Sequence, residues 1–237
     1  MTLKSLEASS LSWSDQSLDV YELGLTSYRE ALEIQHRLHS EVRDKQRFGA
    51  ILMLQHKPVL TLGKNADVSL VLQAQTSLEQ AGIEVVLTDR GGEVTAHEPG
   101  QLVVYPILPL QLLKLPPKLY VDRLMSSVIS TVQHYGIAAE TNPDYPGVWV
   151  EQNKICAVGI RVKERVSLHG IALNISNNLN LFRMIVPCGI RGKGVTSMQN
   201  LLEKTPDVSD VAGIWLENFS ELTNLSVKIQ SSSMILS

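Results

Sequence analysis

One stretch of the chain combines side chains and backbone suited to binding a ligand. Its sequence is RGGEVTAHEPGQLVVYPIL, from Arg90 to Leu108. The two consecutive glycines allow positive φ and a close approach of a ligand to the backbone. They lie near a cation, Arg90, and a titratable ring, His97, between two apolar runs typical of buried strands. Such an arrangement often forms a pocket wall. It fits a tight hairpin with solvated charges equally well, and this stretch alone does not decide between them.

The two cysteines have different surroundings. Cys188 lies between Pro187 and Gly189 in a turn-like loop, which is not the setting of a residue that fills a core. A loop cysteine near a cation can be held as a thiolate, because a positive neighbour favours the ionised form. Cys156 lies inside an apolar strand, where a small buried hydrophobe is the expected role. Cys188 is therefore the cysteine that could be reactive.

A lysine and two glycines near Cys156 could also belong to a site. Lys154 follows a turn, and a lysine on a pocket rim can have a lowered pKa and take part in acid–base chemistry. Taken alone, a lysine whose stem lies along a hairpin is the more common case. Gly159 and Gly170 lie within strands, which suggests close backbone approach or a bulge. His169 precedes Gly170, so a ligand near one would be near the other.

The elements that must position these residues are mixed rather than strictly alternating, which predicts an α+β fold with a mixed sheet. Periodicity and end signals predict helices, which run from Asp15 or Ser17 to about Phe48, from Ser77 to Ala81, from Tyr120 to Tyr135 and from Val208 to Leu222. Short apolar or alternating runs predict strands, at 50–54, 59–62, 83–88 and 102–105 and in an antiparallel meander over 147–176.

Length and composition indicate one domain and exclude several classes of function. The 237 residues contain no linker, so residues 15–224 are expected to form one folded domain, with a loose extension at 1–14 and a C-terminal tail at 225–237. A formal net charge of -3 and 5% aromatic residues argue against nucleic-acid binding. No apolar segment is long enough to span a membrane, and no signal peptide begins the chain. Two cysteines without a disulfide framework favour a reducing, cytoplasmic setting. No zinc spacing or phosphate loop is present.

Four blocks of the sequence resemble, in the same order along the chain, the sequence motifs of the octanoyltransferases of lipoate biosynthesis. The resemblance covers roughly residues 20–202. The matching residues are Arg90 to Thr95 with His97, Pro99, Gly100 and Gln101; Lys154-Ile155 with Gly159; Ser167 to Asn174; and Pro187-Cys188-Gly189. The resemblance implies a single domain similar to the catalytic fold of lipoate and biotin protein ligases.

The same resemblance implies a two-step acyl transfer that begins lipoate synthesis. The Cys188 thiolate would attack the thioester of octanoyl-acyl carrier protein, and a lysine ε-amine of a lipoyl domain would then take the octanoyl (or lipoyl) group from the enzyme. The family match places Lys154 beside Cys188. No ATP, metal or other cofactor is implied. The implied acyl-binding residues are Arg90, Gly91, Gly92, Glu93, Val94, Thr95, Ala96, His97, Ala157, Val158, Gly159, His169, Gly170, Ile171 and Ala172.

The partners implied by the resemblance are proteins. The donor would be octanoyl-acyl carrier protein. The acceptors would be the lipoyl domains of 2-oxoacid dehydrogenase complexes and the carrier protein of the glycine-cleavage system. The enzyme itself is expected to be a monomer.

Two departures from the family pattern and two rival interpretations remain. The family usually has tyrosine at Ala96 and often glycine at Glu98. We therefore expect Ala96 to widen the acyl pocket, with Ala96→Tyr narrowing the range of acyl groups.

The first rival interpretation of the function is an ATP-dependent lipoate or biotin protein ligase, which needs no cysteine nucleophile. The second is a non-catalytic relative that binds the acyl group without transferring it.

Overall fold

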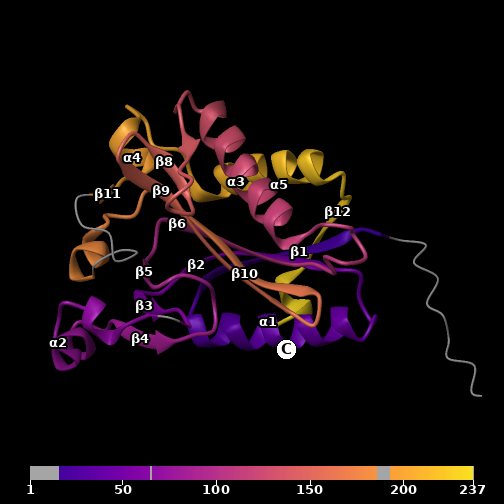
Figure 1. Cartoon of the computed structure of the whole chain (residues 1–237), viewed down its shortest axis with the longest axis horizontal. Helices are drawn as coiled ribbons and strands as arrows, with labels where there is room; N and C mark the ends of the chain where they lie inside the picture. The colour runs from indigo at the N-terminus through magenta and orange to yellow at the C-terminus, as the bar shows by residue number, and fades with distance from the viewer. Residues whose placement is uncertain (1–15, 65, 186–192, 237) are drawn as a thin grey trace, which may run out of the picture.

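In the computed structural model, which describes residues 16–64, 66–185 and 193–236, a large mixed sheet runs through the molecule (Figure 1). Its strands follow the order β12-β1-β2-β6-β10-β9-β8-β7, and β11 also pairs with β9. These strands are β1 (Leu18–Thr26), β2 (Ala50–His56), β6 (Gln101–Ile107), β7 (Glu140–Thr141), β8 (Val148–Val150), β9 (Asn153–Lys163), β10 (Val166–Asn174), β11 (Gly194–Val195) and β12 (Val227–Gln230).

A smaller sheet lies beside the large one and has the order β4-β3-β5. Its strands are β4 (Glu84–Leu87), β3 (Val59–Leu62) and β5 (Val94–His97). The helices are α1 (Tyr28–Arg43), α2 (Gln75–Gln80), α3 (Pro117–His134), α4 (Met198–Leu201) and α5 (Val208–Thr223), with 3-10 turns at η1 (Val68–Leu70), η2 (Asn180–Met184) and η4 (Ser232–Met234).

Helices cover both faces of the large sheet. In Figure 1, α3 and α5 lie on one side of it and α1 on the other. Leu124, Val128 and Val132 of α3 are fully buried, as their spacing predicts, and Trp215 of α5 stacks on Phe219 with ring centroids 4.9 Å apart. Each such side chain contributes roughly 1.5–3 kcal/mol through burial. The predicted α+β class with a mixed sheet is confirmed.

The N-terminal prediction of one long helix is wrong. Residues Leu18–Thr26 form β1, which pairs in parallel with both β2 and β12. Helix α1 begins only at Tyr28, where Ser27 has extended backbone and its side chain accepts a hydrogen bond from the backbone N–H of Glu30 at 3.3 Å. This serine is the N-cap, because its oxygen satisfies one of the unpaired donors of the first turn. Asp15 lies outside the described residues.

The C-terminal boundary also needs correction. The predicted tail, 225–237, contains β12, and Val227 of that strand pairs with Leu18 of β1. Ile235 is buried, and Arg37 of α1 donates to its carbonyl oxygen. The folded domain therefore continues through the described C-terminal residues. The predicted extension at 1–14 lies outside the part of the chain that the structure describes.

Candidate active site

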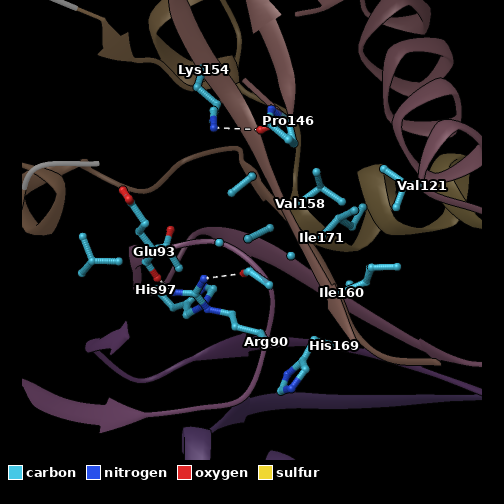
Figure 2. Close-up of a pocket in the computed structure, with 18 of the residues that line it drawn as sticks. Arg90, Glu93, His97, Val121, Pro146, Lys154, Val158, Ile160, His169 and Ile171 are labelled. Carbon is cyan, nitrogen blue, oxygen red and sulfur yellow. Dashed lines mark hydrogen bonds between the residues drawn. The ribbon is translucent and has the colours of Figure 1, made fainter. Parts of the chain in front are cut away.

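A cavity of about 540 Å³ lies against the edge of β9. Strand β8 pairs with β9 only as far as Cys156, and in the described chain no strand pairs with that edge beyond it. One wall comes from the loop after β4, whose Gly91 N–H donates to the carbonyl of Ile160 at 3.0 Å. Figure 2 shows Val158, Ile160 and Ile171 between this loop and Val121 of α3. A deep, largely apolar cavity with a few polar groups is the usual form of a small-molecule site.

The structure brings almost all of the predicted site residues to this cavity. Lys154 and every predicted wall residue except Ala96 line it. Cys188 lies outside the described residues. Other cavity residues were not predicted, because they lie in elements expected to be core, turn or helix; they are Tyr28, Tyr105, Val121, Asp144, Tyr145, Pro146 and Ile160.

The glycines of the wall are needed for close backbone packing. A Cβ atom on Gly159 would lie 2.9 Å from the carbonyl oxygen of Gly91, and one on Gly91 would lie 3.0 Å from the carbonyl oxygen of Ile160. A Cβ on Gly170 would collide with the carbonyl of Val104. A side chain at Gly91 or Gly159 would push the loop away from β9, and one at Gly170 would push β10 away from β6. The predicted close approach at Gly159 and Gly170 is therefore confirmed.

Arg90 holds the wall in shape. Its guanidinium donates to the carbonyl oxygens of Thr61 at 2.6 Å, Glu93 at 2.8 Å and Gly91 at 3.0 Å. It also donates to the hydroxyl of Thr61 at 3.1 Å. These carbonyls belong to β3 and to the glycine-rich loop, so a planar guanidinium with several fixed donors ties the two together. Figure 2 shows Arg90 beside His97 on this wall.

Lys154 is buried, and in Figure 2 it lies at the opposite end of the view from Arg90 and His97. Its side chain is 7% exposed, and Nζ donates to the carbonyl of Pro146 at 2.9 Å. Nζ also lies 4.9 Å from the centroid of the Trp149 ring, within the range of a cation–π contact. Strand β11 pairs Val195 with Lys154, and the N–H of Thr196 donates to the Lys154 carbonyl at 3.0 Å. The lysine is therefore fixed from both its backbone and its ammonium.

Cys156 is a core residue. It is 1% exposed, and its side chain packs in the main hydrophobic cluster. Burial raises the pKa of its thiol to about 12. Such a thiol carries almost no thiolate at neutral pH, as predicted for a structural cysteine.

His169 is held beneath the cavity by a carboxylate. Its Nε2 lies 2.8 Å from Oδ1 of Asp89, and Asp89 also pairs with Arg161. The hydrogen bond with His169 lowers the pKa of Asp89 to about 2, so the carboxylate is ionised and Nε2 donates to it. The backbone N–H of His169 donates to Gln35 at 2.9 Å and supports its positive φ of 59°. Two elements thus orient this ring at the cavity.

Ala96 must be corrected from a wall residue to a core residue. It is fully buried, does not line the cavity, and packs with Leu60, Leu62 and Leu78 in the core of the small sheet. Strand residues alternate between faces, so the neighbours Thr95 and His97 turn the other way.

This placement predicts that Ala96→Tyr overpacks the small sheet without changing the cavity. We expect the free energy of unfolding to fall by about 1–3 kcal/mol, measured by urea denaturation. The preference among acyl chain lengths should stay as in the unsubstituted chain. A narrowed preference at unchanged stability would contradict the placement.

His56 belongs to a buried aromatic cluster behind the cavity. Its Nδ1 donates to the carbonyl of Thr26 at 3.1 Å, and the hydroxyl of Tyr105 donates to its Nε2 at 2.7 Å. The rings of Tyr28 and His97 lie 5.2 and 5.3 Å from the His56 ring. Burial lowers the pKa of His56 to about 4. The imidazole is therefore neutral in the folded protein at neutral pH.

This neutral histidine predicts acid sensitivity. An unfolded histidine has a pKa of about 6.5, so below that pH the unfolded chain binds a proton that the folded chain does not. The contribution of His56 to the free energy of unfolding is fully present above pH 6.5. As the pH falls from 6.5 toward 4, this contribution decreases by up to about 1.4 kcal/mol per pH unit. In His56→Gln, urea denaturation at pH 7, 6 and 5 should show a shallower loss than in the unsubstituted chain. Parallel pH profiles for the two proteins would exclude this effect.

The described residues contain neither a metal-binding cluster nor a helix that could span a membrane. Residues 16–64, 66–185 and 193–236 contain no group of three or more His, Cys, Asp or Glu side chains that could hold a metal ion. None of the helices in the same ranges is long and apolar enough to cross a membrane.

The fold matches the catalytic fold of lipoate protein ligases. A crystal structure of lipoate-protein ligase A bound with ATP matches with a TM-score of 0.73 and 11% identity, over 93% of this chain and 92% of that chain. At this identity the likeness shows the fold alone.

Sequence comparison gives the family. The model of the lipoyl protein ligase A/B catalytic domain matches residues 27–220. An octanoyltransferase from Alkaliphilus metalliredigens is 39% identical over 211 residues, which are 89% of this chain and 97% of the relative. An octanoyltransferase from Clostridium kluyveri is 42% identical over 82% of this chain and 83% of the relative. The chain therefore belongs to the lipoyl protein ligase A/B family, and within it to the octanoyltransferases, which are acyltransferases.

Proposed function

We propose that the chain transfers an octanoyl group from acyl carrier protein to a lysine of a lipoyl domain, through a thioester on Cys188. The observation that carries the proposal is the cavity itself, which combines an apolar wall with a buried lysine. Val121, Val158 and Ile171 are among the apolar residues that line it. Burying the six methylenes of an octanoyl chain would stabilise the complex by about 5 kcal/mol, at about 0.8 kcal/mol for each methylene.

The chemistry of the two steps is balanced without an added energy source. In the first step the Cys188 thiolate adds to the donor thioester carbonyl and the carrier's thiolate leaves. In the second, the lysine amine adds to the enzyme thioester, loses a proton and expels Cys188. An amide is more stable than a thioester, so the second step draws the first one forward. ATP is not consumed in either step.

The proposed roles of Lys154 and Cys188 are compatible with the chain connection. Cys188 precedes Val195 by seven residues, and Val195 pairs with Lys154. Seven residues span at most about 25 Å when extended, so the connection allows the two side chains to meet. A free cysteine with a pKa of about 8.5 is only a few per cent thiolate at neutral pH. A lysine cation near it would raise that fraction.

We propose the same partners and setting that the resemblance implies. The donor is octanoyl-acyl carrier protein. The acceptors are lipoyl domains of 2-oxoacid dehydrogenase complexes and the glycine-cleavage carrier protein. The enzyme acts as a monomer in the cytoplasm.

Intact-protein mass spectrometry tests the proposal. After incubation with octanoyl-acyl carrier protein, the chain should gain the mass of one octanoyl group, and it should lose that mass when a lipoyl domain is added. Free octanoate with ATP is the matched control and should give no transfer. Transfer from free octanoate that requires ATP would instead indicate a ligase. Binding of the carrier protein without a mass gain would indicate a non-catalytic relative.

A further inference from the structure

Trp149 packs its ring against the ammonium of Lys154 without reaching the cavity. The ring centroid lies 4.9 Å from Nζ of Lys154, and Trp149 is 2% exposed. Lys154 lines the cavity, whereas Trp149 is not among the lining residues. Any effect of Trp149 on a bound substrate must therefore pass through Lys154.

An irregularity in β9 brings these two side chains together. Val148 of β8 pairs with Cys156, but the next residue, Trp149, pairs with Lys154, so Ile155 is an extra residue in β9. Ile155 and Cys156 both belong to the main hydrophobic cluster, although residues of a regular strand alternate between faces. Without this bulge, Ile155 would stand opposite Trp149. Bulges often re-aim a side chain beside an active site, and here the re-aimed side chain is Lys154.

The ring itself is held in place by its neighbours. Nε1 of Trp149 donates to the carbonyl oxygen of Tyr145 at 3.0 Å, and the centroids of the two rings lie 6.3 Å apart. On the other edge of β8, Trp149 pairs with Glu140 of β7. The residue after Tyr145 is Pro146, whose carbonyl accepts from Nζ of Lys154 at 2.9 Å. One short segment thus bonds to both the indole and the ammonium and fixes their relative position.

A second ammonium approaches the same ring. Nζ of Lys193 lies 5.7 Å from the centroid, and Lys193 also donates to Gln152. The contact with Lys154 is closer, and Lys154 is 7% exposed, whereas Lys193 is only partly buried. A cation–π contact is stronger where the cation is removed from water. Lys154 is therefore the ammonium on which the ring acts more strongly.

We propose that Trp149 is a positioning residue whose ring holds the ammonium of Lys154 at the cavity for acyl transfer. The inference rests on the proposed function, because that function gives Lys154 its role in the reaction. The face of an indole is electron-rich and attracts a cation more strongly than the face of any other side chain. An aliphatic side chain would fill the same space but would let the ammonium move.

The first test reads the contact without the reaction. In the full chain labelled with ¹³C-lysine, the ε-methylene signal of Lys154, assigned by its loss in Lys154→Met, should be shifted upfield by the ring current of the indole. The shift should persist in part in Trp149→Phe and disappear in Trp149→Leu. Lys193→Gln is the matched control and should leave the signal in place. A signal among those of exposed lysines in the unsubstituted chain overturns the proposal without any variant.

The second test changes the electron density of the ring and keeps its shape. Fluorine withdraws electron density from the ring face, so the chain grown on mono-, di- and trifluorinated tryptophans should show a progressively lower kcat for octanoyl transfer. The KM for the loaded carrier protein should not change, because Trp149 does not touch the substrate. In Trp149→Phe the same analogues should have no effect, which controls for the other tryptophans. In Lys193→Gln the dependence on fluorination should remain.

The substitutions complete this test. Trp149→Leu should lose about 10²-fold in kcat, the scale of a misplacement of about 1 Å, and Trp149→Phe should keep most of the activity. Equal kcat values for these two variants, or a kcat that does not respond to fluorination, would overturn the proposal. So would a dependence that vanishes in Lys193→Gln, because the ring would then act through the other lysine. Absence of octanoyl transfer in the unsubstituted chain would instead overturn the proposed function, while the ring-current shift would still show whether the indole holds the ammonium.

Discussion

Replacing Cys188 by serine is expected to abolish octanoyl transfer, with a loss on the order of 10⁴-fold or more, the scale seen when hydrolases lose their nucleophile. A serine hydroxyl ionises far less readily than a thiol, and a lysine cation that suffices for a thiolate does not suffice for an alkoxide. The mass of the variant should show no octanoyl adduct after incubation with the loaded carrier protein. Its fold, measured by thermal unfolding, should be unchanged.

Cys156→Ala is the matched control for this experiment. The Cys156 side chain is buried in the main core, and its thiol has a pKa of about 12. Removing its sulfur should cost about 1 kcal/mol of stability through the small cavity left behind. Acylation and transfer should both continue. If folded Cys156→Ala were inactive while Cys188→Ser retained transfer, the assignment of the nucleophile would be wrong.

The sequence predicted most of the cavity because its wall is built from local signals. Paired glycines, a cation and alternating strands stand within one stretch, and Gly159 and Gly170 have no other reason to interrupt strands. The residues that it missed come from elements that reach the cavity only through the tertiary fold. Tyr28 begins a helix, and Tyr105 lies in a strand that would be buried in any case.

The errors at the two ends of the chain have one physical cause. Strand β1 is stabilised by parallel pairing of Leu18 with Val227, which lies near the other end of the sequence. Neither β1 nor β12 forms a hairpin, so no turn marks either of them as a strand. Without such a local signal, the sequence pattern predicts β1 as an extension of the amphipathic helix that follows it. Pairing of this kind depends on the whole fold, and single-sequence patterns do not contain it.

The error at Ala96 has a different cause. The resemblance implies a wall position for Ala96, whereas the period of two in β5 separates its side chain from those of its neighbours. Thr95 and His97 share the face that reaches the cavity, and Ala96 turns to the small core. Strand parity was therefore a better guide to this position than the resemblance.

Lys154→Arg is expected to lose octanoyl transfer while keeping a reactive Cys188. If Lys154 supplies only positive charge, arginine can substitute in part, because a guanidinium is always charged. If Lys154 also accepts a proton from the thiol or from the attacking amine, arginine must fail, because it does not deprotonate in proteins. The amine has to lose a proton before an amide can form, and the neutral His97 and His169 are weak bases because burial lowers the pKa of each.

The contacts of Lys154 fix the place at which its charge or its basicity would act. Lys154 is held against the Pro146 carbonyl and the face of Trp149, and it is almost fully buried. We expect Lys154→Arg to react with iodoacetamide at Cys188 near neutral pH, which shows that the thiolate persists. Transfer should fall by about 10²–10⁴-fold, the contribution typical of a general base. Lys154→Met is the control that should lose both properties, since it has neither charge nor basicity. Near-normal transfer by Lys154→Arg would leave Lys154 with an electrostatic role alone, and the proton would then have to leave the amine by way of solvent.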